Sequence, residues 1–124
     1  MTGQKEVISE LTALINARKN VPIARFFAPD FRLHDPGAGV WFEGHDGAQD
    51  MIHGLLALGP KVTLEILDII DQGDRVAVRW QATIGGGPDA RSVAMLAIYR
   101  FVDGRIAEDW GISARLPWNK HRQS

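Results

Sequence analysis

Two adjacent carboxylates, Glu108 and Asp109, lie in an apolar run that follows an Asp-Gly pair at 103–104. Asp-Gly between two apolar runs is a strong signal for a tight hairpin, because both residues tolerate the positive φ angles of the turn. The sequence therefore predicts a strand on each side of the turn, with the two carboxylates pointing to opposite faces of the second strand. An interior carboxylate is costly unless it is paired or used, so one of the two is a candidate for chemistry.

Asp109 shares its predicted strand face with Ala107 and Gly111, small residues that leave space beside it. In an apolar pocket desolvation raises the pKa of a carboxyl group, whereas a nearby arginine lowers it. His34 adds an imidazole, a group that can donate or accept a proton. If Asp109, His34 and Arg79 all face the space between a sheet and its helices, they form a site for general acid–base catalysis.

Other side chains could complete a ligand site around these three. Arg32 shares a strand face with His34, and Gln81 shares one with Arg79. A common inward orientation would produce a polar cluster in a mostly apolar pocket, which is how small-molecule sites are usually built. The predicted substrate contacts are Arg32, Gln81, Trp41, Met51 and Met95.

The same residues also have structural interpretations. His34 could hydrogen-bond the turn at Asp35-Pro36, and Arg79 could form a structural ion pair with Asp109 across neighbouring strands. The four tryptophans could be packing aromatics. The histidines lack compact metal-ligand spacing, so no metal site is predicted. The glycines at 85–87 link two strands and do not open a helix, so they are not a phosphate loop.

The elements that must position these residues are helical in the first half of the chain and extended in the second. Apolar spacing predicts a helix over 4–18, a short helix from Pro22 to Phe27 and a strand over 31–35, followed by a glycine-rich loop. A third helix is predicted to begin with a capping pattern formed by Asp46 and Gln49 and to end at Gly59-Pro60. Runs rich in β-branched and aromatic residues then predict an antiparallel meander of strands over 62–71, 75–84, 91–102 and 105–113. Helices followed by a meander indicate an α+β fold, with the helices on one face of a curved sheet.

The strand over 91–102 is apolar on both faces, although a strand in an antiparallel sheet normally has one wet face. Leu96 and Ile98 lie on one face, and Met95 and Tyr99 lie on the other. Helices cover one side only, so the sequence predicts a homodimer through the outer face of the sheet.

Bulk properties set the wider frame. The 124 residues suffice for a single domain over 1–124, whose C-terminal tail, about 117–124, is expected to be flexible. The net charge of −1 gives no electrostatic case for binding nucleic acid or an anionic membrane. The absence of cysteine excludes disulfides and thiolate metal sites. No apolar run is long enough to span a bilayer and no signal peptide is recognisable, so a cytoplasmic location is expected.

Four blocks of the chain resemble the SnoaL-like polyketide cyclase family, within the nuclear-transport-factor-2-like (cystatin-like α+β) superfamily. The resemblance runs from about residue 28 to residue 112 and rests on the blocks at 31–36, 42–44, 73–80 and 104–111. It implies a cone-shaped, strongly bent antiparallel sheet with the N-terminal helices on its concave face, a deep apolar cavity and a dimer. This fold hosts isomerases, dehydratases, hydrolases, cyclases and non-catalytic binders.

In the cyclases an aspartate in the cavity acts as the base and no cofactor is used. By position Asp109 matches the site on the last strand, and His34 matches a polar cavity position on the first. The resemblance thus implies that Asp109 removes a proton from a carbon next to a carbonyl group, while His34 or Arg79 stabilises the enolate oxygen. Glu108 then points outward.

The sequence therefore predicts a small cofactor-free enzyme that binds an apolar carbonyl compound and works by acid–base chemistry of the cyclase or isomerase type. A non-catalytic ligand binder or dimeric scaffold of the same fold is the alternative. An epoxide-hydrolase-like reaction is a third interpretation, but Gln81 stands where its second carboxylate is sought. Ketosteroid isomerases use a tyrosine from the helical part, whereas the single tyrosine here, Tyr99, lies on a predicted strand.

Overall fold

The computed structural model describes residues 3–35, 37 and 39–114. The helices are α1 (Gln4–Asn16), α2 (Ile23–Phe26) and α3 (Gly44–Leu56), with a 3-10 turn at Gly87–Asp89. The strands are β1 (Phe27–His34), β2 (Val40–Glu43), β3 (Val62–Gln72), β4 (Arg75–Ile84), β5 (Arg91–Val102) and β6 (Arg105–Ala114). The predicted flexible tail at about 117–124 lies outside the described residues.

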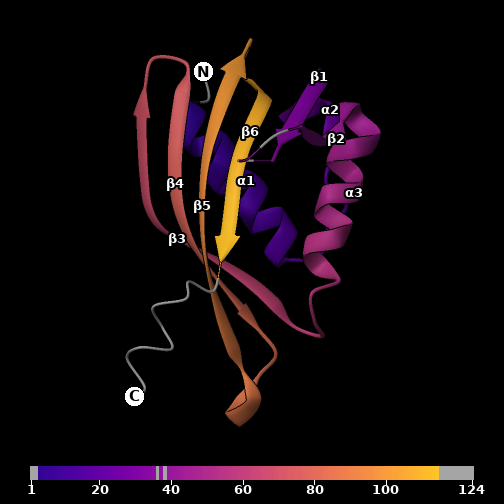
Figure 1. Ribbon diagram of the computed structural model, residues 1–124, viewed down its shortest axis with the longest axis vertical. Helices are drawn as coiled ribbons and strands as arrows, with labels where there is room; N and C mark the ends of the chain where they lie inside the picture. Colours follow the sequence, from indigo (N-terminus) through magenta and orange to yellow (C-terminus); the bar gives the residue numbers. More distant parts are fainter. Residues whose placement is uncertain (1–2, 36, 38, 115–124) are drawn as a thin grey trace.

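The six strands form one sheet in the order β2-β1-β6-β5-β4-β3, with helix α1 lying across one face and α3 beside its β1–β2 end (Figure 1). The α+β class with helices on one side of a bent sheet is confirmed. The sheet is mixed, because β1 runs parallel to β6 while every other neighbouring pair is antiparallel. A parallel pair requires a long crossover connection, and the remaining elements between β1 and β6 supply it.

The predicted meander is confirmed almost to the residue, whereas the region before α3 differs from the prediction. Residues 40–43 form the short edge strand β2 and not a loop. The prediction that Asp46 caps the third helix is wrong, because the helix begins at Gly44 and Asp46 lies within its first turn. Gly44 has a φ of 71°, which glycine adopts without strain and which turns the chain from β2 directly into α3.

A β-bulge determines which side chains of β6 face inward. Asp103 and Gly104 adopt φ angles of 52° and 76°, as the predicted two-residue turn requires. The pairing of β5 with β6 then shifts: Phe101 pairs with Ile106, but Arg100 pairs with Glu108, which leaves Ala107 as the extra residue. Ile106 and Ala107 are consequently both buried, contrary to strict alternation.

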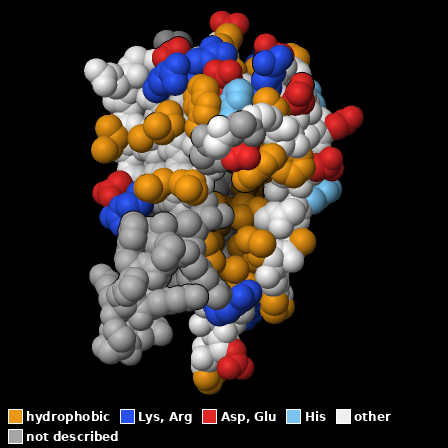
Figure 2. Space-filling model, in the orientation of Figure 1, with side chains coloured by type: hydrophobic (Ala, Val, Ile, Leu, Met, Phe, Trp, Pro, Cys, Tyr) orange, Lys and Arg blue, Asp and Glu red, His pale blue; other side chains and the backbone are white. Residues whose placement is uncertain are grey.

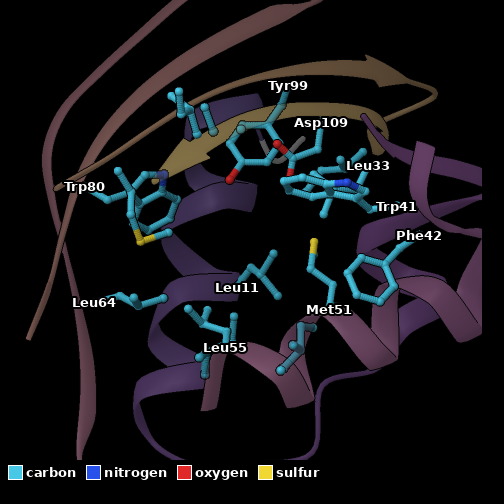
Figure 3. Close-up of a pocket in the computed structure, with 18 of the residues that line it drawn as sticks. Leu11, Leu33, Trp41, Phe42, Met51, Leu55, Leu64, Trp80, Tyr99 and Asp109 are labelled. Atoms are coloured by element: carbon cyan, nitrogen blue, oxygen red, sulfur yellow. The ribbon is translucent and has the colours of Figure 1, made fainter. Parts of the chain in front are cut away.

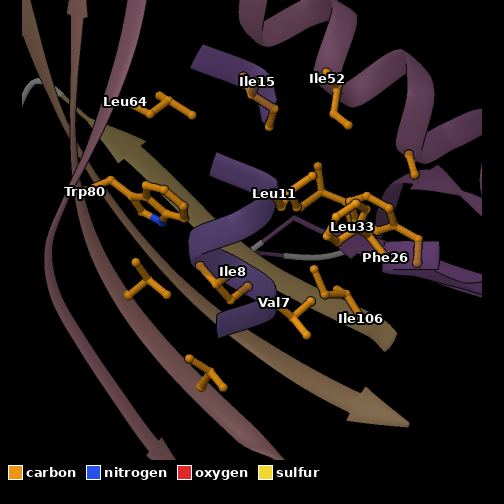
Figure 4. Packing of buried hydrophobic residues seen from close by; sticks show 14 of the residues in the cluster. Val7, Ile8, Leu11, Ile15, Phe26, Leu33, Ile52, Leu64, Trp80 and Ile106 are labelled. Carbon is orange, nitrogen blue, oxygen red and sulfur yellow. The ribbon is translucent and has the colours of Figure 1, made fainter. Parts of the chain in front are cut away.

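The core lies between the concave face of the sheet and the helices. Val7, Ile8, Leu11 and Ile15 are spaced on one face of α1 and are buried against the strands, as Figure 4 shows. On β4 the inward residues are Val76, Val78, Trp80, Ala82 and Ile84. No helix among the described residues has the length and apolar character needed to traverse a lipid bilayer.

Candidate functional site

A cavity of about 710 Å³ lies between the sheet and the helices, a size within the usual range of small-molecule sites. Side chains from α1, α3 and strands β1 to β6 line it, and most of them are apolar. Figure 2 shows it as a hollow lined by hydrophobic side chains, open to solvent beside α3. It therefore suits an apolar ligand.

Asp109 is the buried carboxylate of this cavity. Its residue is 5% exposed, and its Oδ1 atom has no hydrogen-bond partner among the described residues. Burial raises the pKa of this carboxyl group to about 7, because the charged form is poorly solvated there. Asp109 can thus lose or gain a proton near neutral pH, as a general acid or base must.

A glycine on the same strand leaves space beside this carboxylate. Asp109 pairs with Tyr99 on one side and with Leu33 of β1 on the other. A Cβ atom at Gly111 would lie 3.3 Å from Asp109 Oδ1. Gly111 therefore gives the carboxylate its room, as the sequence predicted.

Two further polar groups face the cavity from the sheet. The Trp80 side chain lines the cavity, and its Nε1 atom has no hydrogen-bond partner among the described residues. Burial, followed by the negative charge of Asp109, raises the pKa of the Tyr99 hydroxyl well above its ordinary value. Tyr99 therefore remains a neutral hydrogen-bond donor at physiological pH. Figure 3 shows Trp80, Tyr99 and Asp109 on the sheet side of the cavity, facing apolar side chains from the helices.

Three of the predicted substrate contacts line this cavity: Trp41, Met51 and Met95. Trp41 is 59% exposed, so it is available to contact a ligand; Figure 3 labels it among the cavity residues. Met51 comes from α3 and Met95 from β5. Flexible methionines adapt to ligands of different shape.

The prediction that His34 faces the cavity is wrong. In β1, Leu33 points into the cavity and His34 points to the outer face of the sheet. There its Nε2 atom lies 3.2 Å from Glu108 Oε1, and its ring stacks on Trp110 at 5.0 Å between centroids. Arg100 Nε donates a hydrogen bond of 2.7 Å to Glu108 Oε2. The predicted outward orientation of Glu108 is confirmed.

Arg79, Gln81 and Arg32 also lie away from the cavity, contrary to the predicted polar cluster. Arg79 Nε donates a hydrogen bond of 2.6 Å to Asp68 Oδ2, and both side chains are more than half exposed. A direct ion pair with Asp109 across neighbouring strands is excluded, because β5 separates β4 from β6. Gln81 Nε2 donates a hydrogen bond of 3.2 Å to Ser92 Oγ. Arg32 is exposed, whereas its neighbour Leu33 is buried.

An epoxide-hydrolase-like site would need an arginine that bridges two carboxylates. Arg79 does not bridge to Asp109, because it lies on the other face of the sheet. No group of three or more His, Asp or Glu side chains in the described ranges is placed to hold a metal ion. The structure instead brings together Asp109, Tyr99 and Trp80, which line the cavity from the successive strands β6, β5 and β4. The sequence assigned Trp80 to packing and gave Tyr99 no role, although Tyr99 lies on the same strand face as Met95.

A bent sheet with N-terminal helices packed on one face is the architecture of the nuclear-transport-factor-2-like class of α+β proteins. The family described as SnoaL-like domain matches residues 8–109, and the chain belongs to it. No curated protein matches the chain.

Several solved structures are similar in fold. Wild-type IdmH from Streptomyces antibioticus, a candidate polyketide cyclase, has 23% identity and a TM-score of 0.78, with 99% of this chain and 100% of that chain covered. A loop-truncation variant of IdmH has 27% identity and a TM-score of 0.76, with coverage of 90% and 92%. AclR from Streptomyces galilaeus, a candidate hydroxylase, has 20% identity and a TM-score of 0.74, with coverage of 98% and 93%.

Proposed function

We propose that this protein is an enzyme that binds an apolar carbonyl compound and uses Asp109 as a general base. The observation that carries the proposal is a carboxyl group that is almost fully buried in an apolar cavity. One of its oxygens has no hydrogen-bond partner in the described part of the chain, and burial raises its pKa to about 7. A buried group in this state is costly to stability, so its placement in a cavity is best explained by a role in chemistry.

The proposed reaction begins at a carbon next to the carbonyl group. The C–H bond breaks, its proton moves to Asp109, and its electron pair forms an enolate. If the enolate is conjugated with a C=C bond, return of the proton to another carbon gives an isomer. Attack of the enolate carbon on a second carbonyl group instead closes a ring, and the new alkoxide takes the proton back from Asp109. Ring closure corresponds to the activity for which the candidate cyclases among the structural neighbours are named.

The test measures hydrogen–deuterium exchange at the carbon next to the carbonyl of 1-tetralone in D₂O by NMR. We expect Asp109→Asn to reduce catalysed exchange by about 10²- to 10⁴-fold, the usual contribution of a positioned base. The wild-type rate should rise with pH and level off above about 7, because only the ionised carboxylate accepts a proton.

Asp71→Asn, which removes an exposed carboxylate on β3, is the matched control and should exchange like the wild type. Undiminished exchange in Asp109→Asn would show that Asp109 is not the base. Saturable binding of 1-tetralone without any exchange in the wild type would favour the alternative, a non-catalytic binder.

We also propose that a second copy of the chain covers the outer face of the sheet. Large apolar side chains are exposed there, and Ile70, Leu96, Ile98 and Ile112 surround a groove of about 480 Å³. Asp68 and Arg79 line the same groove but pair with each other within one chain, so covering this face would not bury an unpaired charge from either residue.

We therefore expect Ile98→Glu to yield monomers, because it buries a charge in the centre of the apolar contact. Sedimentation velocity at matched protein concentrations measures the effect. Leu58→Glu, at an exposed apolar residue after α3, is the control and should leave the dimer intact. A wild-type protein that sediments as a monomer at tens of micromolar, a concentration on the order of ordinary dimer affinities, would contradict the proposal.

A further inference from the structure

The indole N–H of Trp80 is a buried donor that the proposed proton transfer does not use. Trp80 is 7% exposed, and Nε1 has no hydrogen-bond partner in the part of the chain that the structure describes. A buried tryptophan N–H usually finds an acceptor, because leaving it unpaired costs free energy. An acceptor on a ligand would satisfy it.

The Trp80 side chain that carries this donor lines the same cavity as Asp109. Trp80 is on β4, Tyr99 on β5 and Asp109 on β6, so three successive strands present polar groups to one apolar space. The Tyr99 hydroxyl lies between the other two: burial and the Asp109 charge raise its pKa, and its contact with the Trp80 side chain lowers it. The Trp80 Nε1 atom does not reach hydrogen-bonding geometry with this hydroxyl among the described residues. Figure 3 shows this row on the sheet side of the cavity, and the labelled side chains opposite it carry no nitrogen or oxygen.

The chemistry of the row is asymmetric. Trp80 can only donate a hydrogen bond, and the Tyr99 hydroxyl stays protonated and can also donate. Asp109 when ionised can only accept. A ligand that satisfies all three must place an acceptor oxygen against Trp80 and Tyr99 and a hydrogen against Asp109.

We propose that Trp80 Nε1–H, with the Tyr99 hydroxyl beside it, binds the carbonyl oxygen of the ligand and makes the cavity select ketones over hydrocarbons of the same shape. This inference rests on the proposed function in assigning the ligand to the same cavity. Its recognition step is separate from proton transfer, because a ketone can bind whether or not Asp109 removes a proton from it.

The test uses fluorenone and fluorene, two rigid compounds that differ by the carbonyl oxygen. Fluorenone has no hydrogen on the carbons next to its carbonyl group, so it measures recognition without the reaction of Asp109. We expect the wild type to bind fluorenone at least about 10-fold more tightly than fluorene, the range of a buried donor that is either satisfied or left unpaired. Isothermal titration calorimetry gives both affinities.

The variant Trp80→Phe keeps an aromatic ring and removes the N–H, so it should largely abolish the preference for fluorenone. Trp41→Phe is the matched control, because Trp41 also lines the cavity but is largely exposed. It should weaken both ligands to a similar extent and leave their ratio unchanged. Tyr99→Phe should reduce the ratio partially.

The infrared carbonyl stretch of bound fluorenone supplies a readout that does not depend on any variant. In the wild type it should lie below its frequency in cyclohexane, since hydrogen bonding weakens the C=O bond, and in Trp80→Phe it should move back toward that value. A bound stretch equal to that in cyclohexane, a ratio near one in the wild type, failure of both compounds to bind, or an unchanged ratio in Trp80→Phe overturns the proposal. Loss of exchange activity in Asp109→Asn has no bearing on this result, so the two proposals fail separately.

Discussion

Asp109→Asn should make the folded protein more stable at pH 8 by on the order of 3 kcal/mol, because it removes a buried ionisable group. The pKa of this carboxyl is raised from 3.8 to about 7 by burial. Between those values the folded state holds a proton that the unfolded state has lost. Stability of the wild type therefore falls as pH rises from about 4 to 7, and the full cost persists above 7.

Urea unfolding of both proteins from pH 4 to pH 8, at one protein concentration, measures the effect. The two curves of unfolding free energy against pH should lie close together near pH 4 and separate as pH rises, with the variant higher. Asp71→Asn serves again as control and should follow the wild type. If Asp109→Asn were less stable than the wild type at pH 8, the buried-carboxylate account of the cavity would be wrong.

Glu108→Gln should have the opposite effect and destabilise the protein by about 1.5 to 3 kcal/mol at pH 7, the range for hydrogen bonds to a charged group. Glu108 joins Arg100 of β5 to His34 of β1 across the outer face of β6. The hydrogen bond from Arg100, and then that from His34, lowers the pKa of Glu108 despite partial burial.

Because the pKa of Glu108 is lowered in the folded state, the stabilisation is fully present at pH values above the ordinary pKa of a glutamate. It is lost as the pH falls through the lowered pKa. The difference between Glu108→Gln and the wild type should thus shrink in acid, which urea unfolding at pH 3 and pH 7 tests. Glu65→Gln, at an exposed position on β3, is the control and should change stability little at either pH. An equal loss at both pH values would mean that packing, and not charge, accounts for the role of Glu108.

Local signals in the sequence were sufficient for most of the fold. The Asp103-Gly104 turn and the β-branched runs determine the meander, because hairpin connections and alternation are properties of neighbouring residues. Strand β2 was missed since four residues between glycines carry little periodic signal. The parallel contact between β1 and β6 joins residues 76 to 79 positions apart, for which local patterns contain no information.

The site was predicted less well, for a reason visible in β4. Val76, Val78 and Trp80 are the apolar face of that strand, so their alternation already implied that Arg79 and Gln81 point outward. The prediction that Arg79 and Gln81 face the cavity relied on their chemical type and not on this alternation. The inward orientation of Asp109 was predicted correctly, because the small residue Gly111 on the same strand face indicates space beside it. Trp80 was missed because its apolar ring determines its burial, and only the tertiary structure shows that its N–H lacks a partner.

The bulge at Ala107 has a consequence for comparing related chains. In a regular hairpin with the same Asp-Gly turn, Tyr99 would pair with Glu108. Glu108 would then be matched to the cavity in place of Asp109. The extra residue shifts the pairing so that Asp109 stands opposite Tyr99. A relative that lacks this residue would carry its equivalent carboxylate one position nearer the turn. Gaps in an alignment of this hairpin therefore belong between the turn and the acid, and a gap-free alignment would assign the wrong residue to the site.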